Sequence, residues 1–350
     1  MDQRYTQLQN WLEQVLPQFE GFDCANWQLL AVSGDASFRR YFRAHSGEST
    51  WIAVDAPPAK EDSRPFVTIA TELEAAGVSV PHVYQTDFTQ GFMLLEDFGD
   101  DQYLAQLNDE TVHSLYTDAL NVLAVMQDCQ PSNGRLFPLY DQPLLQREVE
   151  LFREWFLQGL LELSLDADEQ QMVDFLFNYL IDASLEQPTV FVHRDYHSRN
   201  LMFRDQQPPG VIDFQDAVEG PITYDLVSLL RDCYISWPDE LVYAWVENFR
   251  LGLIERGRVM PDSVYFKRWF DLMGAQRHLK AIGIFSRLNI RDGKPGYLAD
   301  IPRTLGYLIA VAAKTEELQH IAGWLVEKVV PVMRQSPYFD DNVLDDWVVE

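Results

Sequence analysis

The stretch from residue 191 to residue 214 restricts what this chain can fold into more than any other part of the sequence. Asp195 is followed five residues later by Asn200, and Asp213 comes thirteen residues after that. Short apolar runs flank these polar residues, which predicts three buried strands joined by a polar loop and a turn. We therefore expect the fold to hold one amide and two carboxylates in one place.

These three polar residues are the set that phosphoryl transfer from a nucleotide requires. One carboxylate receives the proton of the attacking hydroxyl, while an amide oxygen and a second carboxylate hold Mg²⁺ on the phosphates. We predict Asp195 as the catalytic base and Asn200 with Asp213 as ligands of Mg²⁺, with ATP as the donor. The alternative is a buried hairpin whose polar residues are incidental, but the joint spacing favours a catalytic loop.

The motifs in and after this stretch resemble a known superfamily. The pattern His193-x-Asp195-x4-Asn200, followed by Ile212-Asp213-Phe214, resembles the protein kinase-like superfamily. The next segment contains Gly220-Pro221 and then Tyr224-Asp225-Leu226. In this it is similar to the aminoglycoside phosphotransferase family, which phosphorylates small molecules.

Two N-terminal stretches, 33–42 and 54–58, look like those of bacterial kinases that phosphorylate the anomeric hydroxyl of N-acetylmuramate and N-acetylglucosamine. The resemblance implies an α+β, bilobal protein kinase-like fold. A small antiparallel-sheet lobe at 1–98 would bind the nucleotide, and a larger, mostly helical lobe at 99–350 would carry the catalytic loop and bind the sugar. The implied function is sugar phosphorylation in cell-wall recycling. The alternatives are a kinase for another alcohol, such as an aminoglycoside or choline, and a non-catalytic pseudokinase.

The N-terminal lobe should contain the contacts to the nucleotide. Strand-like runs are predicted at 27–32, 38–44, 50–55, 81–87 and 91–96. Between the first two runs, Ser33, Gly34 and Ser37 form a small polar turn whose backbone N–H groups are predicted to approach the phosphates. The alternative is an ordinary hairpin turn. By resemblance, the backbone of Glu96 and Phe98 would bond the adenine edge.

This lobe departs from the superfamily pattern at one position. The third strand should carry a lysine that pairs with the nucleotide phosphates, and residues 51–55 contain none. Arg40 or Arg43 on the preceding strand is predicted to supply the charge, with Lys60 as a further possibility. The two arginines have opposite parity, so they should face opposite sides of the sheet. The alternative is that both are solvated surface charges.

The sequence also leaves two candidates for the acid that would pair with this cation. Glu72 and Glu74 lie on the helix predicted from residue 65 to residue 76, and either is a candidate for the partner or for a structural role.

The helix predicted after Pro261 carries a basic cluster in an otherwise acidic chain. The cluster and the loop beyond it contain Gln276, Arg277, His278, Lys280, Arg287, Arg291 and Lys294. We predict that Gln276 and Arg277 recognise an acidic group such as the lactyl carboxylate of N-acetylmuramate, since an Arg fork matches a carboxylate. His197 and Asp216 are further candidates for the sugar site. The alternative for the cluster is a set of salt bridges to nearby acids.

Charge excludes several classes of partner. The 350 residues contain 27 Lys plus Arg against 54 Asp plus Glu, a formal net charge of -27, which repels nucleic acid and anionic membranes. The three cysteines show no metal-ligand spacing, and we expect reduced thiols. No targeting segment or bilayer-spanning run is expected. Together these features predict a cytoplasmic protein, which we expect to be a monomer.

Overall fold

The computed structural model describes residues 2–32, 39–129 and 137–347. The chain divides into two compact units, one of Met1–Gly134 with Arg199–Ala217, and the other of Arg135–Ser198 with Val218–Glu350. The chain therefore passes from one unit to the other between Ser198 and Arg199, inside the predicted catalytic loop. The predicted lobe boundary between residues 98 and 99 stays a prediction.

The first unit is built on a five-stranded sheet in which all neighbouring strands are antiparallel, in the order β1-β2-β3-β5-β4. This confirms the predicted antiparallel sheet. The strands are β1 (Gln28–Ala31), β2 (Arg40–Ser46), β3 (Ser49–Asp55), β4 (Val83–Asp87) and β5 (Phe92–Glu96).

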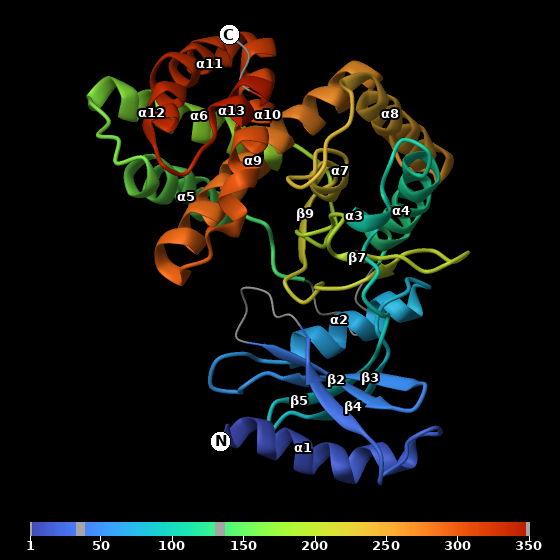
Figure 1. The fold of residues 1–350 in the computed structure, drawn as a ribbon. Helices are drawn as coiled ribbons and strands as arrows, with labels where there is room; N and C mark the ends of the chain where they lie inside the picture. Colours follow the sequence, from blue (N-terminus) through green and yellow to red (C-terminus); the bar gives the residue numbers. More distant parts are fainter. Residues whose placement is uncertain (1, 33–38, 130–136, 348–350) are drawn as a thin grey trace. The chain divides into compact units, whose positions relative to one another are not determined.

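Two helices cover the two faces of this sheet, as Figure 1 shows. Helix α1 (Gln3–Val15) begins at the N-cap Asp2, and its apolar residues recur at helical spacing, so that one side of the helix is buried. That side packs on the even-numbered residues of β2, among them Phe42 and Ala44. Helix α2 (Arg64–Ala75) lies on the opposite face. Because side chains alternate along a strand, neighbours on β2 meet different helices.

The remainder of the first unit ends in a small hairpin. Helices α3 (Tyr103–Gln106) and α4 (Val112–Gln127) follow the sheet, and strands β7 (Leu201–Met202) and β8 (Gly210–Val211) form the hairpin. The Val211 N–H donates to the Ser79 carbonyl at 2.8 Å, and the Phe203 N–H donates to the Asp101 carbonyl at 2.6 Å. These bonds tie the hairpin to the rest of its unit.

The second unit is mostly helical, as predicted, and is organised around the 30-residue helix α9. Its one two-stranded ladder among the described residues pairs β6 with β9. The bounds are α5 (Gln142–Leu151), a π-helix (Phe152–Leu160), α6 (Ala167–Leu185), β6 (Thr189–Val192), β9 (Val218–Pro221), α7 (Tyr224–Leu230), α8 (Asp239–Glu255), α9 (Ser263–Asp292), α10 (Ile301–Lys314), α11 (Gln319–Trp324), a second π-helix (Leu325–Val329), α12 (Val330–Gln335) and α13 (Asp341–Trp347). Short 3₁₀ turns occupy Leu16–Gln18, Pro295–Asp300 and Glu316–Leu318.

Two helix ends in this unit show how local sequence sets the boundaries. The Asp166 carboxylate accepts the Glu169 N–H at the start of α6, and the Glu169 side chain bonds back to the Asp166 N–H. Gly257 has φ +88 just after α8, a conformation that an L side chain would strain. An acidic cap with Glu three residues later and a glycine after the last turn are the usual signals of helix ends, and both are present in the local sequence.

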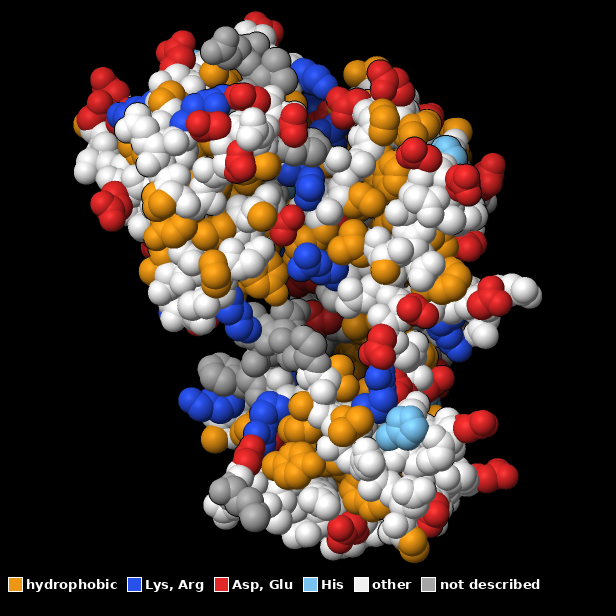
Figure 2. All heavy atoms as spheres, in the orientation of Figure 1, with side chains coloured by type: hydrophobic (Ala, Val, Ile, Leu, Met, Phe, Trp, Pro, Cys, Tyr) orange, Lys and Arg blue, Asp and Glu red, His pale blue; other side chains and the backbone are white. Residues whose placement is uncertain are grey.

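The surface reflects the acidic composition. Figure 2 shows Asp and Glu side chains spread over the visible face of both units, with Lys and Arg side chains between them. None of the helices in the described part of the chain has both the length and the apolar character that a membrane crossing requires.

Candidate active site in two parts

The β7–β8 hairpin of the first unit brings Asn200 and Asp213 together. Leu201 pairs with Val211, and the next residues outward are joined by the Ile212 N–H, which donates to the Asn200 carbonyl at 3.1 Å. Asp213 has φ +65, a left-handed conformation that costs free energy for a residue with a Cβ. The two predicted metal ligands therefore lie at the same end of the short β7–β8 ladder.

The chemistry of these two residues fits Mg²⁺. A hard cation prefers oxygen ligands and needs few from the protein, because phosphates and water complete its octahedron. Asn200 is buried, and the Asp213 Oδ1 accepts the Gln215 side-chain N–H at 2.8 Å, which orients the carboxylate. The described residues contain no cluster of three or more His, Cys, Asp or Glu side chains that could hold a metal. The metal-binding roles of Asn200 and Asp213 stay a prediction.

In the second unit, a buried carboxylate anchors the start of the catalytic loop. Asp225, in the first turn of α7, accepts the His193 N–H at 2.6 Å and the Arg194 N–H at 3.0 Å. Burial raises the pKa of Asp225 to about 6, while His193 and the two N–H groups act in the opposite direction. Arg194 has φ +78, so the loop leaves β6 through a strained residue that these bonds hold in place.

A second carboxylate anchors the loop three residues beyond Asp195. The Asp232 Oδ2 accepts the Ser198 N–H at 3.0 Å and the Ser198 hydroxyl at 2.5 Å. Asp225 lies in the first turn of α7 and Asp232 lies just beyond its last turn, so one short helix and its end fix both ends of the segment that presents Asp195. Sequence reasoning missed both anchors. Asp225 was visible only as part of a family motif, and nothing local marks Asp232.

The surroundings of Asp195 keep its carboxylate ionised. Burial by itself would raise the pKa, but Lys280, His197, Arg277 and Arg194 together lower the pKa of Asp195 to about 2. All of these cations belong to the second unit. At neutral pH Asp195 is therefore a charged acceptor, as its predicted role as the base requires.

Lys280 reaches this site from α9 through a buried polar network. Its Nζ donates to the Tyr224 hydroxyl at 2.9 Å and lies 3.4 Å from the Glu148 carboxylate. Glu148 also binds the Tyr140 hydroxyl and the Arg194 guanidinium. Burial favours protonation of Glu148, but Lys280, Arg194 and Tyr140 more than offset it and lower the pKa. Glu148 was missed, although it is an acid on the apolar side of a predicted helix.

The predicted sugar-binding residues have different surroundings. Gln276 is fully buried on α9, and the buried Arg277 places Nη1 3.6 Å from the Cys233 Sγ. The His197 ring packs edge-on against Tyr234, with centroids 5.3 Å apart. Asp216 is exposed and belongs to the first unit. The sugar-binding roles stay predictions.

The basic cluster on α9 is also divided. His278 and Lys280 are buried, and burial lowers the pKa of His278 to about 3, so that its ring is neutral. Arg291 forms an ion pair with Asp292. The salt-bridge alternative therefore applies to Arg291, which is exposed, and to Lys280, which pairs with Glu148 inside the protein.

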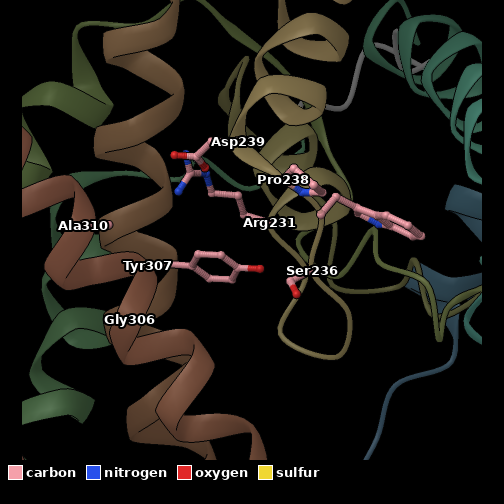
Figure 3. A pocket seen from close by; sticks show the side chains of 8 residues that line it. Arg231, Ser236, Pro238, Asp239, Gly306, Tyr307 and Ala310 are labelled. Atoms are coloured by element: carbon pink, nitrogen blue, oxygen red, sulfur yellow. The ribbon is translucent and has the colours of Figure 1, made fainter. Parts of the chain in front are cut away.

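The second unit contains a cavity of about 450 Å³ between α10 and the segment after α7. Figure 3 shows the Tyr307 ring pointing across it toward Ser236, with Arg231 and Asp239 close together at one side. The Arg231 Nη2 lies 3.3 Å from the Asp239 carboxylate. The lining residues are Arg231, Ser236, Trp237, Pro238, Asp239, Gly306, Tyr307 and Ala310.

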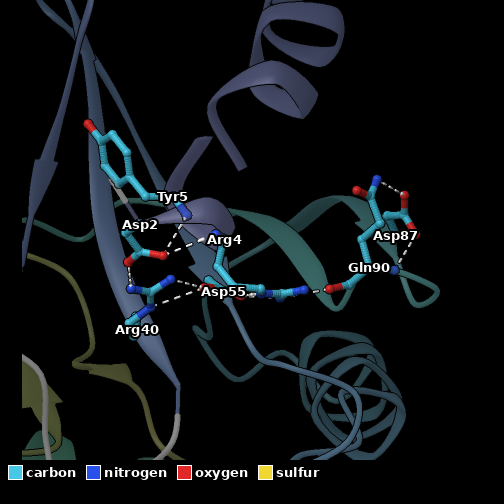
Figure 4. A network of polar contacts seen from close by, with 7 residues as sticks. All are labelled: Asp2, Arg4, Tyr5, Arg40, Asp55, Asp87 and Gln90. Atoms are coloured by element: carbon cyan, nitrogen blue, oxygen red, sulfur yellow. Dashed lines mark hydrogen bonds and ion pairs between the residues drawn. The ribbon is translucent and has the colours of Figure 1, made fainter. Parts of the chain in front are cut away.

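The structure places two of the predicted phosphate-binding residues in ion pairs. Arg40 lies on the α1 face of the sheet, where Asp2 and Asp55 bind its guanidinium (Figure 4). Arg43 lies on the other face and donates to Asp97 at 2.6 Å and Asp100 at 2.7 Å. The two arginines therefore face opposite sides, as their parity predicts. Their contacts to phosphate stay predictions, and Ser33, Gly34 and Ser37 lie outside the described residues.

The remaining nucleotide-site candidates belong to the segment after β5 and to α2. The Glu96 N–H donates to the His82 carbonyl at 2.9 Å, and the Arg204 guanidinium covers the Phe98 ring. Glu74 binds the His82 imidazole at 2.8 Å, which favours its structural role. Glu72 is buried, and Lys60 is exposed in the segment before α2. The adenine contacts of Glu96 and Phe98 stay predictions.

Known proteins resemble this chain over most of its length. The model of the Phosphotransferase enzyme family matches residues 28–261. The N-acetylmuramate/N-acetylglucosamine kinase of Pseudomonas aeruginosa is 42% identical over 91% of this chain and 95% of its own length. That of Neisseria meningitidis serogroup B is 40% identical over 93% of this chain and 96% of its own length.

A solved structure supports the fold. Aminoglycoside phosphotransferase APH(2'')-Ib, in its ADP-bound form, covers 88% of this chain and 98% of its own with a TM-score of 0.57 at 14% identity. This likeness confirms the predicted kinase-like fold class, and the family match confirms a phosphotransferase. The chain therefore belongs to the Phosphotransferase enzyme family.

Proposed function

We propose that this phosphotransferase is an ATP-dependent kinase that phosphorylates the anomeric hydroxyl of N-acetylmuramate and N-acetylglucosamine. The identity to relatives with that name, 40% to 42% over more than nine tenths of the chain, supports the choice of sugar. One observation supports the chemistry: Asp195 is an ionised carboxylate on a loop that buried carboxylates anchor at both ends.

In this mechanism the sugar hydroxyl attacks the γ-phosphoryl group in line, and no covalent enzyme intermediate forms. Asp195 orients the hydroxyl and takes its proton as the new oxygen–phosphorus bond forms. A carboxylate with a pKa of about 2 is a weak base, so the proton moves late. The anomeric hydroxyl is the most acidic hydroxyl of the sugar, and it is therefore the acceptor that such a base suits.

Asn200 and Asp213 would hold Mg²⁺ on the triphosphate. When bound, the metal neutralises the charge that develops on the transferred phosphoryl group. The chain supplies an amide oxygen and a carboxylate from one end of one hairpin. Arg277 in the second unit is a candidate for the lactyl carboxylate of N-acetylmuramate. We place the reaction in cell-wall recycling in the cytoplasm, carried out by a monomer.

The deciding experiment measures ADP release with MgATP and a panel of acceptors. We expect turnover with N-acetylmuramate and N-acetylglucosamine, and a phosphorus NMR signal of an anomeric phosphate. Turnover only with an aminoglycoside or choline would contradict the sugar assignment. The absence of any turnover from a protein that binds ATP would favour the pseudokinase alternative.

The base is tested with Asp195→Asn. This variant should lose most turnover while it still binds nucleotide, because the amide keeps the shape of the carboxylate but does not take a proton. A near wild-type rate with N-acetylglucosamine would show that another group is the base.

A further inference from the structure

The sheet of the first unit lacks a cation at the position where the kinase resemblance implies one. Strand β3 contains neither lysine nor arginine. A nucleotide kinase nevertheless needs positive charge beside the phosphates. The inference below rests on the proposed ATP-dependent function and concerns which residue supplies that charge.

Arg40 lies on the face of the sheet that α1 covers, and this position keeps it from this role. It follows the parity of Phe42 and Ala44, which pack against α1, and the carboxylates of Asp2 and Asp55 bind it there. Arg43 binds Asp97 and Asp100, at and beyond the end of β5. The guanidinium groups of Arg40 and Arg43 are therefore each already paired with two carboxylates of the first unit.

Arg39, which directly precedes β2, is placed differently. It has the parity of Tyr41 and therefore belongs to the face opposite α1. Arg39 is only 6% exposed, and its Nη2 lies 3.0 Å from the Glu61 carboxylate. A buried guanidinium needs such a partner, because an unpaired buried charge is very costly.

The same side of the sheet carries one of the predicted metal ligands. Glu61 stands just before α2, and the Phe66 ring in the first turn of α2 packs 4.8 Å from the Phe214 ring, next to Asp213. Burial and then the Asp213 charge raise the pKa of Tyr41 to about 12, while Arg39 acts against both. Arg39, Glu61, Tyr41 and Asp213 therefore form one group within the first unit.

We propose that Arg39, positioned by Glu61, supplies the cationic contact to the nucleotide phosphates that a lysine on β3 would otherwise make. The planar guanidinium has five N–H donors, so it can keep its bond to Glu61 and still offer a fork to phosphate oxygens. Glu61, which precedes α2, would then be the acid that pairs with the phosphate-binding cation. The candidates from the sequence for that role were Glu72 and Glu74.

The test measures nucleotide binding without sugar, so that it does not depend on which sugar is phosphorylated. Isothermal titration with MgATP and with adenosine is compared for wild type, Arg39→Met and Arg39→Lys. We expect Arg39→Met to weaken MgATP binding about 10- to 100-fold, the loss of a charged hydrogen-bond pair, and to leave adenosine binding unchanged. Arg39→Lys keeps the charge without the fork, so its affinity should be intermediate.

Arg64→Met is the matched control. Arg64 belongs to the same unit, three residues from Glu61, but its side chain is 68% exposed. It should bind MgATP like wild type. Wild-type MgATP affinity in a folded Arg39→Met protein would overturn the inference, and so would an equal loss of adenosine affinity. If Arg39→Met does not fold, wild-type MgATP affinity in a folded Arg39→Gln protein overturns it instead.

Two more outcomes separate this inference from its competitors. A loss in Arg40→Met or Arg43→Met as large as in Arg39→Met, at unchanged adenosine affinity, would move the phosphate contact to that residue and overturn the assignment. A wild-type protein that binds neither MgATP nor adenosine would contradict the proposed function itself.

Discussion

The carboxylate of Asp225 accepts the backbone N–H of His193 at 2.6 Å, and both groups are buried. The bond joins the first turn of α7 to the residue that follows β6, where the predicted catalytic loop begins. Since the same carboxylate also accepts the Arg194 N–H, it fixes two successive peptide groups and hence the direction in which Asp195 leaves the strand. A buried carboxylate on α7 thus fixes the position of the proposed base.

Replacing Asp225 with Asn should lower kcat about 100-fold, because a small displacement of the base has an effect of that size. An amide has one acceptor oxygen, and its NH₂ group would face one of the two N–H donors. The KM for ATP should change by less than about threefold, since nucleotide contacts are assigned to the first unit.

Steady-state kinetics with both substrates varied would check this prediction. Glu240→Gln, a change of an exposed acid in the same unit, is the control and should behave like wild type. An Asp225→Asn enzyme with wild-type kcat would show that the loop does not depend on this anchor.

Lys280→Met should move the acid limb of the pH–rate profile upward. Lys280 is the largest of the charges that lower the pKa of Asp195 to about 2, so its removal lets that pKa rise. The working form is ionised, and activity is therefore lost as pH falls through the pKa of Asp195. In wild type this loss should lie near pH 2, below an earlier fall near pH 6 where Asp225 takes up a proton, and in the variant it should lie at least about one pH unit higher.

The measurement is kcat/KM as a function of pH, compared with Lys267→Met. Lys267 is also on α9 but lies over the Tyr243 ring instead of beside Asp195. A shifted limb in both variants, or in neither, would contradict the assigned role of Lys280. A merely structural defect would lower the rate without shifting the limb.

Arg277→Met should change the preference between the two sugars. If Arg277 binds the lactyl carboxylate, the ratio of kcat/KM for N-acetylmuramate to that for N-acetylglucosamine should fall about tenfold or more. If Arg277 acts only on Asp195, kcat/KM should fall by the same factor for both sugars. Competition between the two sugars in one reaction measures the ratio directly, with the exposed Arg256→Met as the control.

Asp213→Ala should lower Mg²⁺-dependent turnover about 100- to 1,000-fold, because an ionised oxygen ligand is lost from the site of charge development. Asn200→Ala should raise the Mg²⁺ concentration for half-maximal rate about tenfold. Turnover is measured over a Mg²⁺ titration, with Asp205→Ala in the β7–β8 turn as the control. Full activity of Asp213→Ala at ordinary Mg²⁺ would remove this residue from the metal site.

Asp55→Ala should lower the free energy of unfolding by about 1–3 kcal/mol without altering the sites. Asp55 is fully buried on β3, and Figure 4 shows Arg4 of α1 and Arg40 of β2 meeting at its carboxylate. Its removal leaves two partly exposed arginines to water and frees α1 from the sheet. Urea unfolding measures the change, and wild-type stability would show that the apolar contacts of α1 suffice.

Local patterns predicted much of the fold. Residues 4–19 carry the apolar periodicity of an amphipathic helix, which the structure forms as α1, and strand-like runs predicted the five strands of the sheet, because both signals depend only on which side of an element is buried. The cap at Asp166 and the stop at Gly257 were likewise readable from short-range hydrogen bonding and backbone conformation. Parity alone placed Arg40 and Arg43 on opposite faces.

Three features of the candidate site were not readable in this way. Asp232 meets Ser198 across 34 residues, Lys280 meets Glu148 across 132, and Arg39 meets Glu61 across 22. The two residues of a long-range pair lie far apart in the sequence, so no local hydrophobic periodicity indicates the pair. Each of these residues read alone is an ordinary polar side chain.

The sequence by itself determined which chemical groups are present: the spacing of Asp195, Asn200 and Asp213 selects phosphoryl transfer, since the groups that the reaction needs sit on one short, strongly patterned stretch. Only the tertiary structure decided which charges surround them. Charge acts through space and through burial, so the folded chain made Lys280 a neighbour of Asp195, committed Arg40 to Asp55, and buried Arg39 beside Glu61.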